Sequence, residues 1–172
     1  LRTYKKGSAV GKSNIVCGHY TNISQPGEHI TWLRDPLARD VSHFNYDCKY
    51  GHELTKDFAQ HLSMMSGNFI VLWLYGKYIG RHDSVDMKAR YETVRKVLKE
   101  KFLRVYDSDK FEESWDEVAE MLKVDKDPRL TSNRSIKDYR QVQKLNDLSE
   151  EFKIWHRSYN NYDYLLYEEF CK

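Results

Sequence analysis

The sequence predicts an α/β fold in which a mainly parallel sheet is flanked by helices. Short runs typical of strands alternate with longer runs in which apolar residues recur at the three- and four-residue spacing of an amphipathic helix. The 172 residues include only 3 Pro and 8 Gly, with no internal repeat and no low-complexity tract. At 40% hydrophobic content, the chain is long enough for one core, so we expect residues 1–172 to form a single domain.

The first two expected strands both end in polar residues at a turn. They are Asn14–Val16, before Cys17-Gly18-His19, and His29–Leu33, before Arg34-Asp35-Pro36. A helix should then run to about Tyr50, with Asp35 as its N-cap and Pro36 at its first position. Its apolar residues recur at helical spacing and are Leu37, Val41, Phe44 and Cys48.

The later elements continue the alternation. We expect a helix at Glu53–Met65, a buried segment of undecided type at Asn68–Tyr75, a helix with the apolar face Met87, Tyr91, Val94 and Leu98, a strand at Phe102–Tyr106 and a helix at Phe111–Leu122. The polar segment Lys126–Ser135 should be a loop. Asp138–Leu145 and Ser149–Phe170 should be helical, the second broken near Asn160-Asn161.

Composition excludes several classes of partner and site. The 28 Lys and Arg against 26 Asp and Glu leave a net charge of +2, so no overall basic field indicates nucleic acid, and any anion site must be local. The longest apolar run, Phe69–Tyr75, is far below transmembrane length, and we expect no membrane contact by this segment. The cysteines and histidines show no tight ligand spacing, so we expect no metal.

The segment from His29 to Phe44 contains the most informative chemistry. A strand brings Arg34 to the start of a capped helix, where unpaired amides, the positive end of the macrodipole and a planar guanidinium all favour a phosphate. Ser42 lies two turns further, roughly 10 Å along the axis, and can line the same groove. The alternative is that Arg34 and Asp35 form a local ion pair and that Ser42 is an ordinary surface residue.

The same segment resembles a sulfotransferase motif position for position. LRDPLARDVSHF, Leu33–Phe44, matches the pattern R-D-P-x-x-R-x-x-S-x-[FY], whose Arg and Ser hold the 3′-phosphate of 3′-phosphoadenosine-5′-phosphosulfate (PAPS). Weaker similarities follow in order at Gly18-His19-Tyr20, Phe102–Tyr106 with Phe111–Trp115, and Asp163–Phe170. Together they cover about residues 14–170 and are similar to the membrane-associated glycan sulfotransferases, especially the heparan and chondroitin uronyl 2-O type.

The resemblance implies a P-loop-kinase-like sulfotransferase fold and transfer of a sulfuryl group from PAPS to a hydroxyl of a glycan or similar acceptor, without a metal. It assigns the 3′-phosphate to Arg34 and Ser42, with Arg39 a weaker candidate. His19 is the expected general base, since a neutral imidazole suits deprotonation of a hydroxyl near pH 7. The uronyl 2-O enzymes have His-Gly-His where this chain has Cys17-Gly18-His19, so only the second His is kept.

Two loops complete the comparison with the family. The loop at Arg129–Ser135 falls where family members close over the nucleotide, so the resemblance adds Arg129, Asn133, Arg134 and Ser135 to the cofactor site; a solvated polar loop is the alternative. The 5′-phosphosulfate loop P-K-x-G-[ST]-[ST] is only vaguely approached by Lys5–Ala9. We therefore expect either a further segment before residue 1 or a degenerate member that cannot catalyse alone.

Two other functions remain open from the sequence. A non-catalytic sulfotransferase-like module would bind an anionic nucleotide or glycan without transfer. A nucleotide or small-molecule kinase would need a true P-loop, but Gly7–Ser13 has three residues between its glycines where the motif requires four. For a sulfotransferase, we expect the Golgi lumen in a eukaryote and the cytoplasm in a bacterium or virus.

Overall fold

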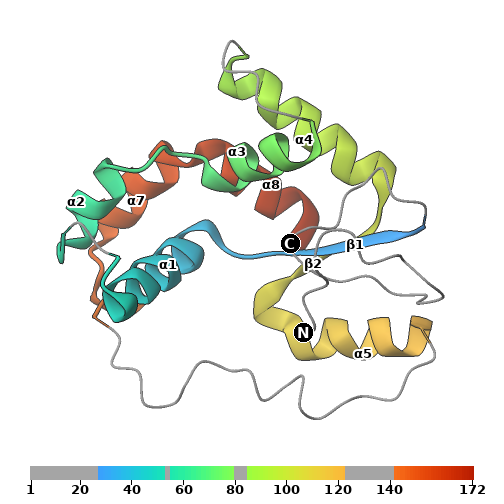
Figure 1. The fold of residues 1–172 in the computed structure, drawn as a ribbon, viewed down its shortest axis with the longest axis horizontal. Helices are drawn as coiled ribbons and strands as arrows, with labels where there is room; N and C mark the ends of the chain where they lie inside the picture. The colour runs from blue at the N-terminus through green and yellow to red at the C-terminus, as the bar shows by residue number, and fades with distance from the viewer. Residues whose placement is uncertain (1–26, 53–54, 80–84, 123–141) are drawn as a thin grey trace.

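The computed structural model describes residues 27–52, 55–79, 85–122 and 142–172, and within this part the fold is mostly helical (Figure 1). Two strands, β1 (His29–Leu33) and β2 (Phe102–Asp107), pair in parallel. The helices are α1 (Pro36–Tyr50), α2 (Phe58–Ser63), α3 (Phe69–Tyr78), α4 (Met87–Lys101), α5 (Phe111–Leu122), α7 (Glu150–Tyr159) and α8 (Asn161–Cys171). Short 3₁₀ turns lie at Ser108–Lys110 and Leu145–Asp147. The expected parallel pairing with flanking helices is thus confirmed for two strands.

Helices cover both faces of the small sheet. Figure 1 shows α5 on one side of β1 and β2, and α3, α4 and α8 on the other. Trp32 anchors the α5 side: its indole N–H donates to Ser114 Oγ at 2.8 Å, and its ring packs on Tyr106 and Phe111. Leu33, the next residue of β1, is buried in the opposite layer. This alternation is what a strand covered on both faces requires.

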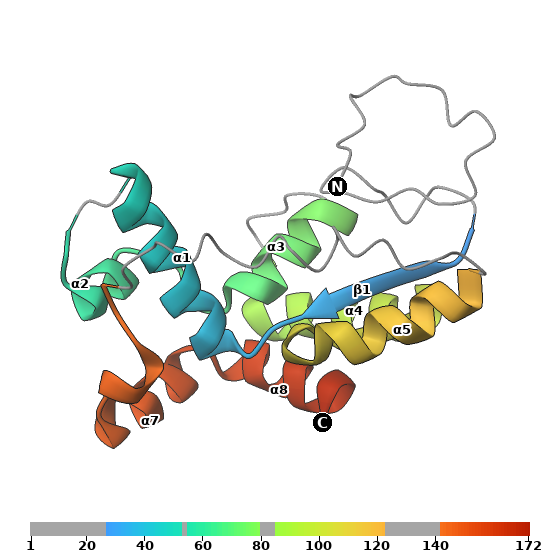
Figure 2. The same ribbon diagram turned by 90° about the horizontal axis from the view of Figure 1, so that it is seen from below.

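Two apolar clusters make up the core. The larger joins the sheet to α3, α4 and α8 and contains Leu33, Val71, Leu74, Tyr75, Tyr91, Val94, Leu98, Leu166 and Tyr167. The smaller joins α1 to α2, with Phe152 of α7 packed against it, and contains Leu37, Val41, Phe44, Phe58 and Leu62. Figure 2 shows α1, α2 and α7 together at one end of the molecule and β1, α4 and α5 at the other.

Helix α1 has the boundaries that its sequence predicts. Asp35 caps its start by accepting the Ala38 N–H at 3.0 Å, and Pro36 occupies the first turn. Gly51 ends it in the left-handed conformation, with φ 68°, where glycine has no steric penalty. The predictions for β1, α4, β2, α5 and the break at Asn160 are also confirmed.

One predicted helix was wrong in extent, and the structure assigns the segment whose type was left undecided. The helix expected at Glu53–Met65 is only α2, because Asp57 caps it by accepting the Gln60 N–H at 2.8 Å. The undecided segment after Asn68 is the helix α3; its residues are apolar on most sides, which hides the helical period.

The end of the predicted Asp138–Leu145 helix is not α-helical in its described part. The N–H groups of Val142 and Gln143 donate to Asn45 Oδ1 at 2.8 and 2.9 Å. Asn45 Nδ2 in turn donates to the Gln143 carbonyl at 2.8 Å. The Asn45 side chain therefore forms hydrogen bonds with backbone N–H and C=O groups that would otherwise pair within a helix.

Two further predictions, the strand Asn14–Val16 and the loop Lys126–Ser135, lie outside the described residues. Among the helices that the structure describes, none combines the length and the apolar character needed to cross a bilayer.

Candidate functional site

The turn from β1 into α1 places Arg34 at the carboxyl end of the sheet. Its side chain is 43% exposed, and its Nε lies 3.8 Å from Oδ1 of Asp109, which follows β2. Because β1 and β2 are parallel, both residues lie at the same edge. Arg34 is therefore accessible to a dissolved anion, although a carboxylate stands beside it. An exposed ion pair of this length is worth only about 0–1 kcal/mol, so a phosphate could displace Asp109 at small cost.

Ser42 lies two turns along α1 from this edge. It is exposed, on the side of the helix away from the buried residues Leu37, Val41 and Phe44. Its hydroxyl is thus open to solvent, as a phosphate ligand must be.

Arg39, the third predicted residue within the described part, is engaged by the protein itself. Its guanidinium pairs with the neighbouring Asp40 and lies over the Phe69 ring, 3.5 Å from the centroid. Only 16% of the side chain is exposed. Arg39 thereby connects α1 to the start of α3. Both of its contacts are with the protein itself, so its main role is in packing.

The amides at the start of α1 are already in use, which differs from the expectation that they face an anion. Pro36 has no N–H, the Ala38 N–H donates to Asp35 Oδ1 at 3.0 Å, and the Arg39 N–H donates to the Asp35 carbonyl at 2.8 Å. An anion at this edge would be held by the side chains of Arg34 and Ser42 rather than by helix-start amides.

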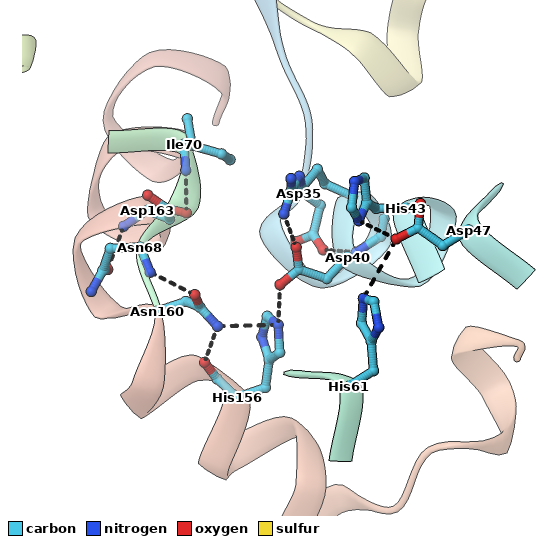
Figure 3. Close-up of polar contacts among 12 residues, drawn as sticks. Asp35, Asp40, His43, Asp47, His61, Asn68, Ile70, His156, Asn160 and Asp163 are labelled. Carbon is cyan, nitrogen blue, oxygen red and sulfur yellow. Dashed lines mark hydrogen bonds and ion pairs between the residues drawn. The ribbon is translucent and has the colours of Figure 1, made fainter. Parts of the chain in front are cut away.

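A buried series of hydrogen bonds connects α1 to α7 and α8 (Figure 3). His156 of α7 is fully buried. Its Nε2 lies 3.0 Å from Asp40 Oδ2 and its Nδ1 lies 3.1 Å from the Tyr164 hydroxyl. With Nε2–H donating to Asp40, the Tyr164 O–H donates to Nδ1; Nε2 also lies 3.2 Å from Asn160 Nδ2, an amide group that donates to the His156 carbonyl. Burial raises the pKa of Tyr164, so the phenol keeps its proton.

This series of hydrogen bonds has the residue types of a catalytic relay, but its histidine is as deeply buried as a structural residue. Because His156 has no exposed surface, it cannot touch a substrate in this conformation. Its effect is to hold Asp40, and through Asp40 the neighbouring Arg39, in place. The sequence did not indicate this role, since 116 positions separate His156 from Asp40.

The structure also assembles a potential metal-ligand set that sequence spacing did not reveal. His43 and Asp47 of α1 meet His61 of α2 (Figure 3), and one ligand atom from each lies within 4.8 Å of the others. The i, i+4 spacing of His43 and Asp47 was the only local indication, because His61 joins them through tertiary packing.

A cavity of about 480 Å³ lies elsewhere, beside the start of α4 and the junction of α7 and α8. Its walls include Asn68, Arg90, Tyr159 and Tyr162. Neither Arg34 nor Ser42 lines it, so it is separate from the edge at which the sequence predicts an anion.

Five predicted site residues lie outside the described residues: His19, Arg129, Asn133, Arg134 and Ser135. Among the predicted set, the structure therefore locates Arg34, just before α1, and Arg39 and Ser42, within the first half of α1. In comparisons with protein-family models, curated proteins and solved structures, nothing matches this chain.

Proposed function

We propose that the chain is a PAPS-dependent sulfotransferase that passes a sulfuryl group to a hydroxyl of a glycan or similar acceptor, within a P-loop-kinase-like sulfotransferase fold. One observation carries the proposal. An exposed Arg34 follows β1 directly, the capped helix α1 begins two residues later, and an exposed Ser42 lies two turns along it. That is the arrangement in which the motif R-D-P-x-x-R-x-x-S can hold a phosphate.

In this proposal Arg34 and Ser42 bind the 3′-phosphate of the nucleotide. The guanidinium supplies a planar pair of donors and the hydroxyl supplies one more. Arg39 is the weaker candidate because its charge is already paired with Asp40. Arg129, Asn133, Arg134 and Ser135 are assigned to the loop that closes over the nucleotide.

His19 is the proposed general base. Its neutral imidazole takes the proton of the acceptor hydroxyl as the oxygen attacks sulfur in line. The bond between sulfur and the bridging oxygen of the 5′-phosphate breaks, and adenosine 3′,5′-bisphosphate leaves with that oxygen. The acceptor becomes a sulfate ester, and the histidine holds the proton until solvent removes it.

Nucleotide binding tests the 3′-phosphate assignment. We expect adenosine 3′,5′-bisphosphate to bind more tightly than adenosine 5′-monophosphate in isothermal titration calorimetry. A charge-assisted contact is worth roughly 1.5–3 kcal/mol, and tenfold in affinity is about 1.4 kcal/mol. Arg34→Ala should therefore weaken bisphosphate binding by about tenfold or more and remove most of the preference, while Ser42→Ala should have a smaller effect.

Two variants serve as controls for charge. Arg104→Ala removes another exposed arginine, which pairs with Glu117 on the α5 side of β2, and should leave the affinity unchanged. Asp109→Asn removes the carboxylate beside Arg34 and should tighten binding slightly. Equal affinity for the two nucleotides in the unmodified chain would refute the 3′-phosphate assignment, and preferential binding of nucleoside triphosphates would favour a kinase instead.

Transfer activity tests His19 separately. In protein that transfers sulfate, His19→Ala should lower the rate by about 10²–10⁴-fold, the usual effect of losing a general base, and should leave the affinity for the bisphosphate nearly unchanged. A variant with normal turnover would remove His19 from the mechanism. Binding of the bisphosphate without transfer, in the unmodified chain, would show the non-catalytic module instead.

A further inference from the structure

Three side chains at the contact of α1 and α2, none of them assigned to the nucleotide, converge on one point. His43 and Asp47 are one turn apart on α1 and so lie on the same face of that helix. His61 reaches them from α2 (Figure 3). The facing atoms are His43 Nδ1, His61 Nε2 and Asp47 Oδ2, all within 4.8 Å of one another.

The apolar contact between the two helices holds these side chains together. Phe44, the residue after His43, is fully buried, and its ring centroid lies 5.1 Å from that of His61 and 5.3 Å from that of Phe58. Leu62, the residue after His61, belongs to the same cluster. The approach of the three polar atoms is thus imposed by core packing rather than by mobile surface side chains.

Both facing imidazole nitrogens lack a hydrogen-bond partner among the described residues. His43 Nδ1 and His61 Nε2 are buried atoms, and the His61 side chain is only 9% exposed. They lie 3.4 and 3.9 Å from Asp47 Oδ2. Buried polar atoms without a partner are rare and costly, and here two of them point at one carboxylate oxygen.

These separations match the spacing of ligands around a metal ion. Two ligand atoms bound at 2.0–2.1 Å in a tetrahedral Zn²⁺ site lie about 3.3 Å apart. The distance from His43 Nδ1 to Asp47 Oδ2, 3.4 Å, already has this value; the 3.9 Å distance from His61 Nε2, and the distance between the two imidazole nitrogens, which is within 4.8 Å, shorten with a small movement of one side chain. Two imidazoles and one carboxylate are a common ligand set for Zn²⁺.

We propose that His43, Asp47 and His61 bind a divalent transition-metal ion of the Zn²⁺ class. The ion joins α2 to α1 and satisfies both unpartnered nitrogens. Three protein ligands leave the fourth coordination position of a tetrahedral ion for water or another small ligand.

Zinc titration of the full chain, after removal of metal with a chelator, tests the site. Calorimetry should detect one Zn²⁺ ion bound by the unmodified chain and by His52→Gln, which changes an exposed histidine outside the cluster. His43→Gln, Asp47→Asn and His61→Gln should each weaken this binding by about 100-fold or more, beyond the usual effect of losing a residue that only orients a ligand.

Circular dichroism and thermal unfolding distinguish the loss of metal binding from the loss of folding. Since His61 is buried, its replacement can also loosen the α1–α2 contact, so the partly exposed His43→Gln is the deciding variant and circular dichroism checks that it is folded. Zn²⁺ should raise the thermal midpoint of the unmodified chain and of His52→Gln, but not that of His43→Gln. No binding by the unmodified chain, or equal binding by His43→Gln, would overturn the proposal and leave a metal-free histidine–carboxylate cluster.

Discussion

Asn68 and Asp163 cap the starts of each other's helices although 95 positions separate them. The Asp163 carboxylate accepts the N–H groups of Ile70 and Val71 in the first turn of α3, each at 2.8 Å. Asn68 Oδ1 accepts the N–H groups of Tyr162 and Asp163 in the first turn of α8, at 2.8 and 3.2 Å. Asn68 has the positive φ of 57° that this geometry requires and that asparagine tolerates well. Each residue thus satisfies two amides that its partner helix cannot pair internally.

Burial and hydrogen bonding act in opposite directions on Asp163. Loss of solvation raises the pKa of its carboxyl from 3.8 to about 7, while the amides of Val71 and Ile70 favour the ionised form. Between those two values the folded chain binds a proton that the unfolded chain does not, so the contribution of Asp163 to stability falls as pH rises from about 4 to about 7. The slope is at most about 1.4 kcal/mol per pH unit.

Asp163→Asn should therefore destabilise the chain by an amount that depends on pH. Its amide group presents a donor to one of the α3 amides, which costs about 1–3 kcal/mol for an unsatisfied buried group. The difference in free energy of unfolding between unmodified chain and variant should be largest near pH 4 and shrink toward pH 7 in urea titrations. A difference that grows with pH would mean that the two amide hydrogen bonds outweigh burial.

At the scale of elements, the turn before α3 is packed directly against the end of α7. A Cβ atom at Gly67 would lie 2.6 Å from the backbone oxygen of Tyr159. This contact is with the backbone and cannot be relieved by a side-chain rotation. The Tyr159 hydroxyl also donates to the Met65 carbonyl at 2.7 Å, so the turn and the helix end are joined on both sides of the glycine.

Gly67→Ala should consequently destabilise the chain by about 1–3 kcal/mol, the usual cost of overpacking. Gly76→Ala is the matched control, because Gly76 lies in α3 with nothing within 4 Å of its added Cβ. That change should stabilise the chain by up to about 1 kcal/mol through helix propensity. Chemical denaturation of the two variants measures both effects, and equal effects of the same sign would contradict the close α7 contact.

At the scale of the whole molecule, polar residues connect the two apolar clusters. His156 links α7 to Asp40 of α1, and Asn160 accepts the Asn68 N–H at 2.8 Å, which links the α7–α8 junction to α3 (Figure 3). Fully satisfied buried networks fix a single arrangement of the elements that they join. The position of α1, and of Arg34 at its start, thus depends on residues near the other end of the chain.

The elements whose boundaries depend on local chemistry could be predicted from the sequence. Asp35, Pro36 and Gly51 define α1 because a cap, a fixed φ and a left-handed residue act within one helical turn. The same local chemistry correctly indicated β1 and the break at Asn160.

Features that depend on partners far away in the sequence could be seen only once the chain was folded. Asn45 of α1 accepts the backbone N–H groups of Val142 and Gln143, where the spacing of residues had predicted a helix. His61 completes its cluster with His43 and Asp47 only because α2 packs on α1. Propensity and periodicity report on neighbours along the chain, whereas a buried polar group is satisfied by whichever partner folding brings to it.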